Sequence, residues 1–153
     1  MPTFYPSQRL TDYTNVDVTV ERIASGGMGL VAFGPDQGSG RMRALKTMRP
    51  DVLTNASIRE RFISEALTWV GLWPHANVLS AQFLTMINGL PVLVLDYAEH
   101  GSLRDLLRAA RRQGQPYLPI GAVIEVAQHI AAGLVALHTP DPAFLRERPI
   151  VHR

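Results

Sequence analysis

The sequence predicts an α+β protein in which a small antiparallel sheet carries one main helix and leads into a helical region. Strand-like patterning is expected in five segments, at 16–24, 30–34, 42–48, 78–87 and 91–97. Helical patterning is expected in three segments, at 57–72, 102–113 and 121–138. This order places one helix against a five-stranded sheet and leaves the last two helices in a separate region.

Turn and cap signals separate these segments. A glycine-rich stretch at 25–29 and a turn cluster at 35–40 divide the first three strands, and Asn88-Gly89 joins the last two in a hairpin. Ser57 followed by Glu60 predicts a capping box at the start of the main helix. The segment 1–15 is polar and contains prolines, which indicates a lead-in to the domain.

Composition excludes several classes of protein. The 153 residues are 46% hydrophobic and 18% charged, which is typical of a soluble globular domain, and we expect a cytoplasmic location. The absence of cysteine excludes disulfide frameworks and thiolate metal sites, and we expect no metal site. A net charge of +2 is too small to indicate nucleic-acid binding. We expect no membrane segment, because Glu125, Gln128 and His129 interrupt the most apolar stretch.

The glycine-rich stretch suggests a phosphate-binding loop. Gly26, Gly27 and Gly29 provide positions where no Cβ would hold the backbone away from phosphate oxygens, although a plain hairpin turn would have the same composition. A dinucleotide-binding loop should open into a helix, and a P-loop should contain Gly-Lys before a helix. Here the loop opens into a strand, so both of those alternatives fail.

A lysine and a carboxylate are expected to pair near this loop. Lys46 alone reads as a strand lysine that points to solvent. Glu65, however, lies between Ile58, Phe62 and Trp69 on the wheel of the main helix. A carboxylate inside an apolar stripe requires a cation, and Lys46 is the candidate from the sheet.

Taken in order, these features resemble the protein kinases, and the Gly-Gly-Met-Gly core is especially similar to that of bacterial kinases of the eukaryotic type. The resemblance covers about residues 16 to 153. Its motifs are Ile23 to Val31, Arg43-Ala44-Leu45-Lys46, Phe62 to Ala66, His75-Ala76-Asn77-Val78, Val92 to Ala98 and Ile150-Val151-His152-Arg153. It implies a protein-kinase-like fold, with a five-stranded N-lobe and the first helices of an incomplete C-lobe.

The resemblance also implies an ATP site. The loop residues that would cover the phosphates are Ile23, Ala24, Ser25, Gly26, Gly27, Met28 and Gly29, where Ala24 replaces the family's first glycine. Lys46, paired with Glu65, would grip the α and β phosphates. The adenine would be held by Val31 and Ala44, by the gatekeeper Leu95, and by backbone groups of Asp96 and Ala98. Ser102 would either contact the ribose or serve only as a helix cap.

The expected domains are the lead-in 1–15, the N-lobe and hinge 16–98, and the start of the C-lobe 99–153. The last four residues match the beginning of the catalytic loop, so the catalytic aspartate and the magnesium-holding residues of the family would follow them. We therefore expect serine/threonine protein kinase activity, with ATP and magnesium, in a complete domain and none in this chain alone.

The partners would be a protein substrate or the remaining C-lobe. The alternative is a non-catalytic nucleotide-binding or kinase-interacting fragment, or a truncated product without function. The arginines at 104, 108, 111 and 112 indicate a solvated helix face, with a docking role as the alternative.

Overall fold

The chain folds into two compact units in the computed structural model, which describes residues 4–12, 15–27 and 29–139. Unit 1 comprises Met1–Leu72 and Ser80–Tyr97, and unit 2 comprises Trp73–Leu79 and Ala98–Arg153. The expectations for Met28 and for the terminal motif 150–153 lie outside the described residues.

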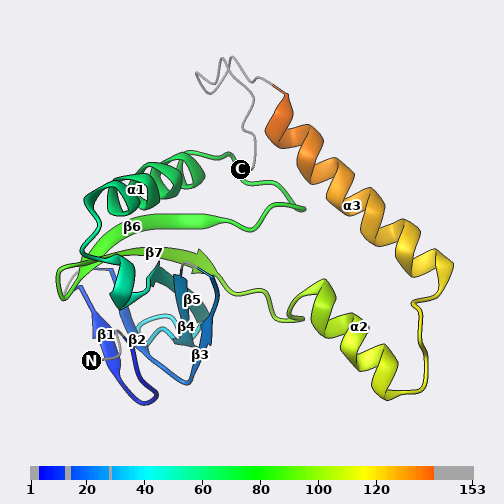
Figure 1. Cartoon of the computed structure of the whole chain (residues 1–153), viewed down its shortest axis with the longest axis horizontal. Helices are drawn as coiled ribbons and strands as arrows, with labels where there is room; N and C mark the ends of the chain where they lie inside the picture. Colours follow the sequence, from blue (N-terminus) through cyan, green and yellow to red (C-terminus); the bar gives the residue numbers. More distant parts are fainter. Residues whose placement is uncertain (1–3, 13–14, 28, 140–153) are drawn as a thin grey trace. The chain divides into compact units, whose positions relative to one another are not determined.

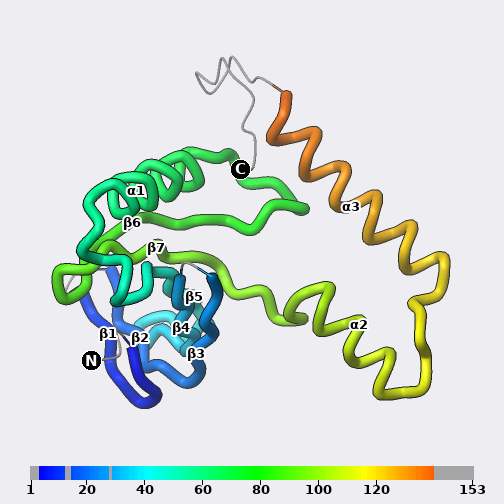
Figure 2. The backbone as a smooth tube through the Cα atoms, in the orientation of Figure 1, coloured from blue at the N-terminus to red at the C-terminus, as the bar shows by residue number. Residues whose placement is uncertain are grey.

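Unit 1 contains the predicted five-stranded antiparallel sheet (Figures 1 and 2). Its strands are β3 (Arg22–Ser25), β4 (Gly29–Pro35), β5 (Met42–Met48), β6 (Ala81–Ile87) and β7 (Leu90–Asp96), in the spatial order β3-β4-β5-β7-β6. The hairpin between β6 and β7 turns through Asn88 and Gly89, which both have positive φ (51° and 77°), as a type I′ turn requires. The sequence expectation for this hairpin is confirmed.

Helix α1 (Ala56–Val70) covers one face of the sheet and lies along β6 (Figure 1). Ala66 is buried with sheet residues Ala44, Leu93 and Leu95, and side chains on either side of Ala66 pack around this cluster. The helix begins one residue earlier than expected, and Asn55 caps it by accepting a hydrogen bond from Ile58 N at 3.2 Å. The capping box predicted at Ser57 is therefore wrong, because Ser57 lies inside the first turn.

The other face of the sheet is covered by an N-terminal segment that includes the described part of the expected lead-in 1–15. It forms a hairpin of β1 (Arg9–Thr11) and β2 (Asp17–Thr19), which pair antiparallel. Its apolar side chains are buried with those of the sheet in one cluster, Phe4, Leu10, Val16, Val18 and Val20 with Ala32, Leu45, Ile87, Val92 and Val94. Phe4 and Leu10, from the expected lead-in, therefore contribute to the core.

The single strand expected at 16–24 is two strands, because the backbone changes partner between Val20 and Glu21. Val20 N donates to Gln8 O at 2.8 Å, whereas Glu21 N donates to Phe33 O at 2.8 Å. The chain thus leaves the N-terminal hairpin at Val20 and joins the five-stranded sheet one residue later. The alternation of Val16, Val18 and Val20 ends at this point, because position 22 is arginine and the next apolar residue is Ile23, so the sequence pattern changes phase where the backbone changes partner.

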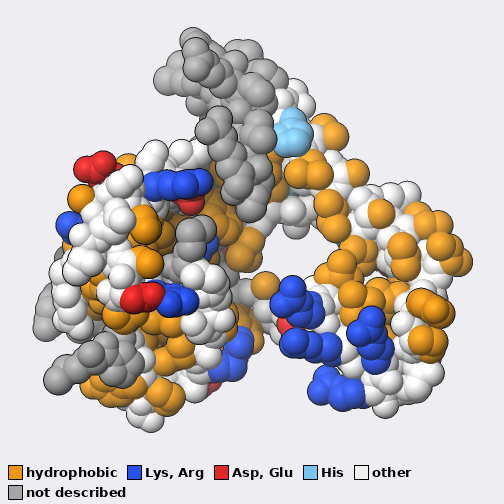
Figure 3. Space-filling view, in the orientation of Figure 1, with side chains coloured by type: hydrophobic (Ala, Val, Ile, Leu, Met, Phe, Trp, Pro, Cys, Tyr) orange, Lys and Arg blue, Asp and Glu red, His pale blue; other side chains and the backbone are white. Residues whose placement is uncertain are grey.

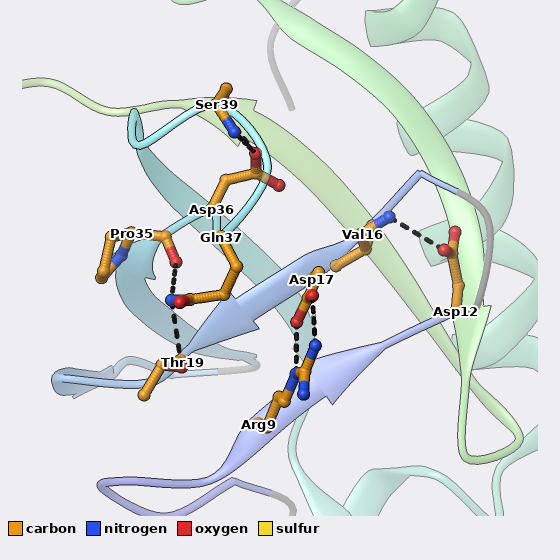
Figure 4. Close-up of polar contacts among 9 residues, drawn as sticks. All are labelled: Arg9, Asp12, Val16, Asp17, Thr19, Pro35, Asp36, Gln37 and Ser39. Atoms are coloured by element: carbon orange, nitrogen blue, oxygen red, sulfur yellow. Dashed lines mark hydrogen bonds and ion pairs between the residues drawn. The ribbon is translucent and has the colours of Figure 1, made fainter.

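Polar contacts fasten the hairpin to itself and to the turn after β4 (Figure 4). The Arg9 guanidinium donates to both carboxylate oxygens of Asp17, at 2.6 and 2.5 Å, and holds the pKa of that carboxyl below its usual value. Gln37 Nε2 donates to Thr19 Oγ1 at 3.2 Å and to Pro35 O at 3.3 Å. These contacts are exposed, so we attribute most of the hairpin's stability to its buried apolar residues.

Unit 2 contains α2 (Leu103–Arg112) and α3 (Ile120–His138). Ser102 caps α2 in a capping box with Asp105, which confirms its expected structural role. The arginine side chains of α2 gather on an exposed surface (Figure 3), as expected for a solvated face. Helix α3 packs through Gly133, which is buried, and a Cβ there would lie 2.7 Å from Asn77 O.

The rest of α3 is apolar and largely exposed within the described residues. The exposed side chains include Ile120, Val123, Ile124, Ile130, Leu134 and Val135. By length and composition alone the 19-residue helix could cross a membrane, although core helices of soluble proteins meet the same criterion. The described residues of unit 2 leave this surface uncovered.

We predict that a polypeptide of these 153 residues self-associates through α3, because an uncovered apolar surface of this kind favours association. Ile130→Gln/Leu134→Gln should shift size-exclusion elution towards the monomer. His129→Gln, on the same helix, should leave the elution unchanged. A monomeric elution of the unsubstituted polypeptide would contradict the prediction.

Candidate functional site

One face of the five-stranded sheet brings together four residues that the sequence predicts at a nucleotide site. Ala44 lies opposite Leu95 on β7, and Lys46 lies opposite Val31 on β4. Directly opposite residues of an antiparallel pair share a face, as do residues two apart in a strand. All four side chains are therefore on the face covered by α1, and Val31, Ala44 and Leu95 contribute to the apolar cluster there.

The register of β3 places the two residues before the loop on different faces. Ala24 lies opposite Val31 and shares its face, whereas Ile23 lies opposite Ala32. Ile23 packs against the cluster beneath the N-terminal hairpin. The structure therefore does not bring Ile23 to the face that carries Lys46. Ser25 ends the strand and is exposed.

The glycine-rich loop is a tight connection in which Gly26 N donates to Gly29 O at 2.9 Å. A Cβ at Gly29 would lie 3.0 Å from the backbone oxygen of Thr47, so the packing of β4 on β5 explains this glycine. A Cβ at Gly26 or Gly27 would meet no atom within 4 Å. Packing within the protein does not explain these two glycines, and the space beside them is open to a ligand.

Arg49 contacts the loop and was missed by the sequence analysis. Its Nη1 donates to Gly27 O at 3.4 Å, and its guanidinium also forms an ion pair with Asp51. The hydrogen bonds from Arg49 hold the pKa of the Asp51 carboxyl below its usual value. The only signal for Arg49 in the sequence is its place directly after the strand β5.

The expected ion pair between Lys46 and Glu65 is not formed in the structure. The Glu65 carboxylate is 65% exposed and pairs with Arg61, one turn earlier on α1, at 3.2 Å. Lys46 Nζ instead lies 5.6 Å from the centroid of the Trp69 ring. The reason is the rotation of α1: Ala66 is at the centre of the stripe that faces the sheet, so Glu65 lies at its solvent edge.

Lys46 is also the only lysine in the sequence. Every other residue among the 15 lysines and arginines is an arginine. This signal is present in the sequence alone. Lysine and arginine are not interchangeable at a charged contact, and this lysine occupies a half-buried position on β5.

The strand that leads out of the sheet ends in a polar cluster. Leu95 is buried, and the next residue, Asp96, accepts from Gln82 Nε2 at 2.8 Å and pairs with Arg43 at 3.5 Å. Tyr97 packs edge-on against Phe33, with ring centroids 5.8 Å apart. These contacts fix the end of β7 within unit 1.

The last two predicted site residues, Ala98 and Ser102, belong to unit 2. Ala98 O accepts from Gly101 N at 3.3 Å, and the Ser102 side chain is occupied by the cap of α2. Among the residues described, no three His, Asp or Glu side chains are grouped so that they could hold a metal ion.

Comparison with known proteins assigns the family. The family model for protein tyrosine and serine/threonine kinases matches residues 18–153. The chain is similar to the serine/threonine-protein kinase pkn2 of Myxococcus xanthus, with 29% identity over 86% of this chain and 14% of that protein. It is also similar to the serine/threonine-protein kinase PknF of Mycobacterium tuberculosis, with 28% identity over 88% of this chain and 26% of that protein.

The fold agrees with this assignment. The crystal structure of the Mycobacterium tuberculosis PknI kinase domain matches with a TM-score of 0.64 and 22% identity, over 89% of this chain and 51% of that one. The chain therefore belongs to the protein kinase family and has a protein-kinase-like fold. It spans about half of the solved kinase domain and at most about a quarter of the two bacterial relatives.

Proposed function

We propose that the chain is the ATP-binding portion of a serine/threonine protein kinase domain, which in complete form transfers the γ-phosphoryl group of ATP to protein hydroxyl groups. The observation that carries this proposal is the position of the only lysine. Lys46 lies on the same sheet face as the apolar residues Val31, Ala44 and Leu95, on the strand next to β4, which follows the glycine-rich loop.

The residues on this face fit ATP. The apolar side chains provide a surface for a flat aromatic base, the ammonium group provides a cation for phosphate oxygens, and the open space beside Gly26 and Gly27 admits the phosphates. Magnesium, when bound with ATP in this family, supplies charge neutralisation at the phosphates. The chain's own residues would hold the base and the phosphate groups in position.

The alternative proposal is a non-catalytic fragment that binds nucleotide and associates with another polypeptide. The exposed apolar surface of α3 is the observation that favours it. Both proposals require nucleotide binding by unit 1, so binding is the property to test first.

We predict that Gly27→Val weakens ATP binding by at least about 5-fold, corresponding to ~1 kcal/mol, because the new side chain occupies the open space beside the loop. The melting temperature should remain unchanged, since a Cβ at this position meets no protein atom within 4 Å. Titration with a fluorescent ATP analogue measures the affinity.

Gly38→Val, in the turn between β4 and β5, is the matched control. A Cβ there makes only an ordinary contact, 3.7 Å from Asp36 Oδ1, so both stability and binding should be retained. Equal affinity of the Gly27→Val variant and the unsubstituted chain would refute the loop's assignment to phosphate binding.

A further inference from the structure

A row of side chains crosses four strands on the sheet face that carries the candidate site. Directly opposite residues of neighbouring antiparallel strands share a face. The register therefore places on this face, from β3 to β7, the residues Arg22, Phe33, Ala44 and Leu95. Ala44 and Leu95 belong to the surface proposed to hold the base, so Phe33 adjoins that surface on β4. Phe33 is half-buried and packs against the cluster that contains both of them.

The Phe33 ring contacts two further side chains. From β3, the guanidinium carbon of Arg22 lies over the ring, 4.0 Å from its centroid. From the residue after β7, the Tyr97 ring meets Phe33 edge-on, with centroids 5.8 Å apart and an interplanar angle of 75°. Both contacts lie within the distances at which a cation or a second ring attracts an aromatic ring. The three side chains therefore form one stack, the Arg22–Phe33–Tyr97 stack.

This stack reaches the chain at the point where the strand pairing of β7 ends. The pairing of β7 with β6 ends at Leu95, and its pairing with β5 ends at Asp96. Tyr97 follows directly, and its ring ties this part of the chain to Phe33 on β4. The same part of the backbone is proposed to bond the adenine, and hydrogen bonds to a base weaken steeply when the backbone is misaligned.

We propose that Phe33 is a positioning residue for the adenine base, and that it acts through Tyr97 by holding the backbone at the end of β7 where it binds the base. This inference rests on the proposed function. The aromatic ring is the required feature of Phe33, because an edge-on pair of rings has a preferred geometry that an aliphatic contact lacks. Arg22 supports the same ring from the neighbouring strand.

Nucleotide affinity tests whether Phe33 and Tyr97 act as a unit, by titration of the whole chain with a fluorescent ATP analogue. Phe33→Leu and Tyr97→Leu should each lower the affinity about 5-fold. The double variant should also lose about 5-fold, because either substitution alone removes the contact between the rings. Tyr97→Phe retains the ring and should stay within about 2-fold of the unsubstituted chain. Tyr117→Leu is the control, since Tyr117 is 82% exposed between α2 and α3.

Competition by parts of the nucleotide separates positioning of the base from a general effect on the sheet. Adenosine contains the base without phosphates, and inorganic tripolyphosphate contains phosphates without the base. Measured by displacement of the ATP analogue, Phe33→Leu should lower the affinity for adenosine about 5-fold and leave that for tripolyphosphate unchanged. An equal loss for both competitors would mean that the substitution disturbs the whole sheet, and it would overturn the inference.

Two other results would overturn the inference and leave the proposed function intact. If Tyr97→Leu lost affinity and Phe33→Leu did not, Tyr97 would contact the base without help from Phe33. If the losses added in the double variant, the two residues would act independently. Absence of binding of the ATP analogue by the unsubstituted chain would instead refute the proposed function, and the inference with it.

Discussion

Adding a methyl group at Gly34, by the substitution Gly34→Ala, should destabilise unit 1 more than adding one at any other glycine of the sheet. A Cβ at Gly34 would lie 1.8 Å from the carbonyl oxygen of Thr19 and 2.8 Å from its carbonyl carbon. Both are backbone atoms, so no side-chain rotation relieves the overlap. The N-terminal hairpin must move away from β4, which exposes buried core residues such as Val18 and Val20.

We expect a loss of about 3 kcal/mol or more in the free energy of unfolding, at the upper end for overpacked cores. For a domain of this size it corresponds to a decrease in melting temperature of roughly 10 °C or more. Thermal unfolding followed by circular dichroism measures it. Gly38→Ala, in the turn after β4, is the control and should melt like the unsubstituted protein. A Gly34→Ala melting temperature within about 2 °C of the unsubstituted protein would contradict the described packing.

Lys46→Met should lower ATP affinity by about 10-fold or more, because hydrogen bonds to charged groups contribute about 1.5–3 kcal/mol each. Methionine retains most of the apolar stem, so the fold should be preserved. Arg41→Met is the matched control: Arg41 is exposed just before β5, and each variant lowers the net charge from +2 to +1. Titration with a fluorescent ATP analogue measures both. If the two variants lost ATP affinity equally, Lys46 would contribute only general positive charge and no specific contact with the phosphates.

The sheet could be predicted from the sequence because its signals are local. β5 has the expected bounds, Met42–Met48, and the Asn88-Gly89 dipeptide specifies the turn between β6 and β7. The N-terminal hairpin could not be predicted in this way. Its strands have three residues each, and Leu10 is an isolated apolar residue that is buried in a cluster with residues of distant strands as well as of its own hairpin.

The sequence predicts which residues of the sheet share a face, but not the partner of Lys46. The alternation of β5 correctly indicates that Ala44 and Lys46 share a face. The partner of Lys46 depends instead on the rotation of α1, which the helical wheel does not determine here. Stripes centred on Glu65 or on Ala66 both include Phe62 and Trp69, and the packing of Ala66 against the sheet selects the second.

Affinity labelling of the single lysine tests the central claim, that Lys46 is the phosphate-contacting residue of a nucleotide site. An ATP derivative with an amine-reactive acyl phosphate at its terminal phosphate can acylate only Lys46 or the α-amino group, since the sequence has no other lysine. Peptide mass spectrometry then assigns the label. We predict rapid acylation of Lys46 that excess ATP suppresses, with slow acylation of the α-amino group that ATP does not affect. Equal labelling of the two amines, insensitive to ATP, would contradict the claim.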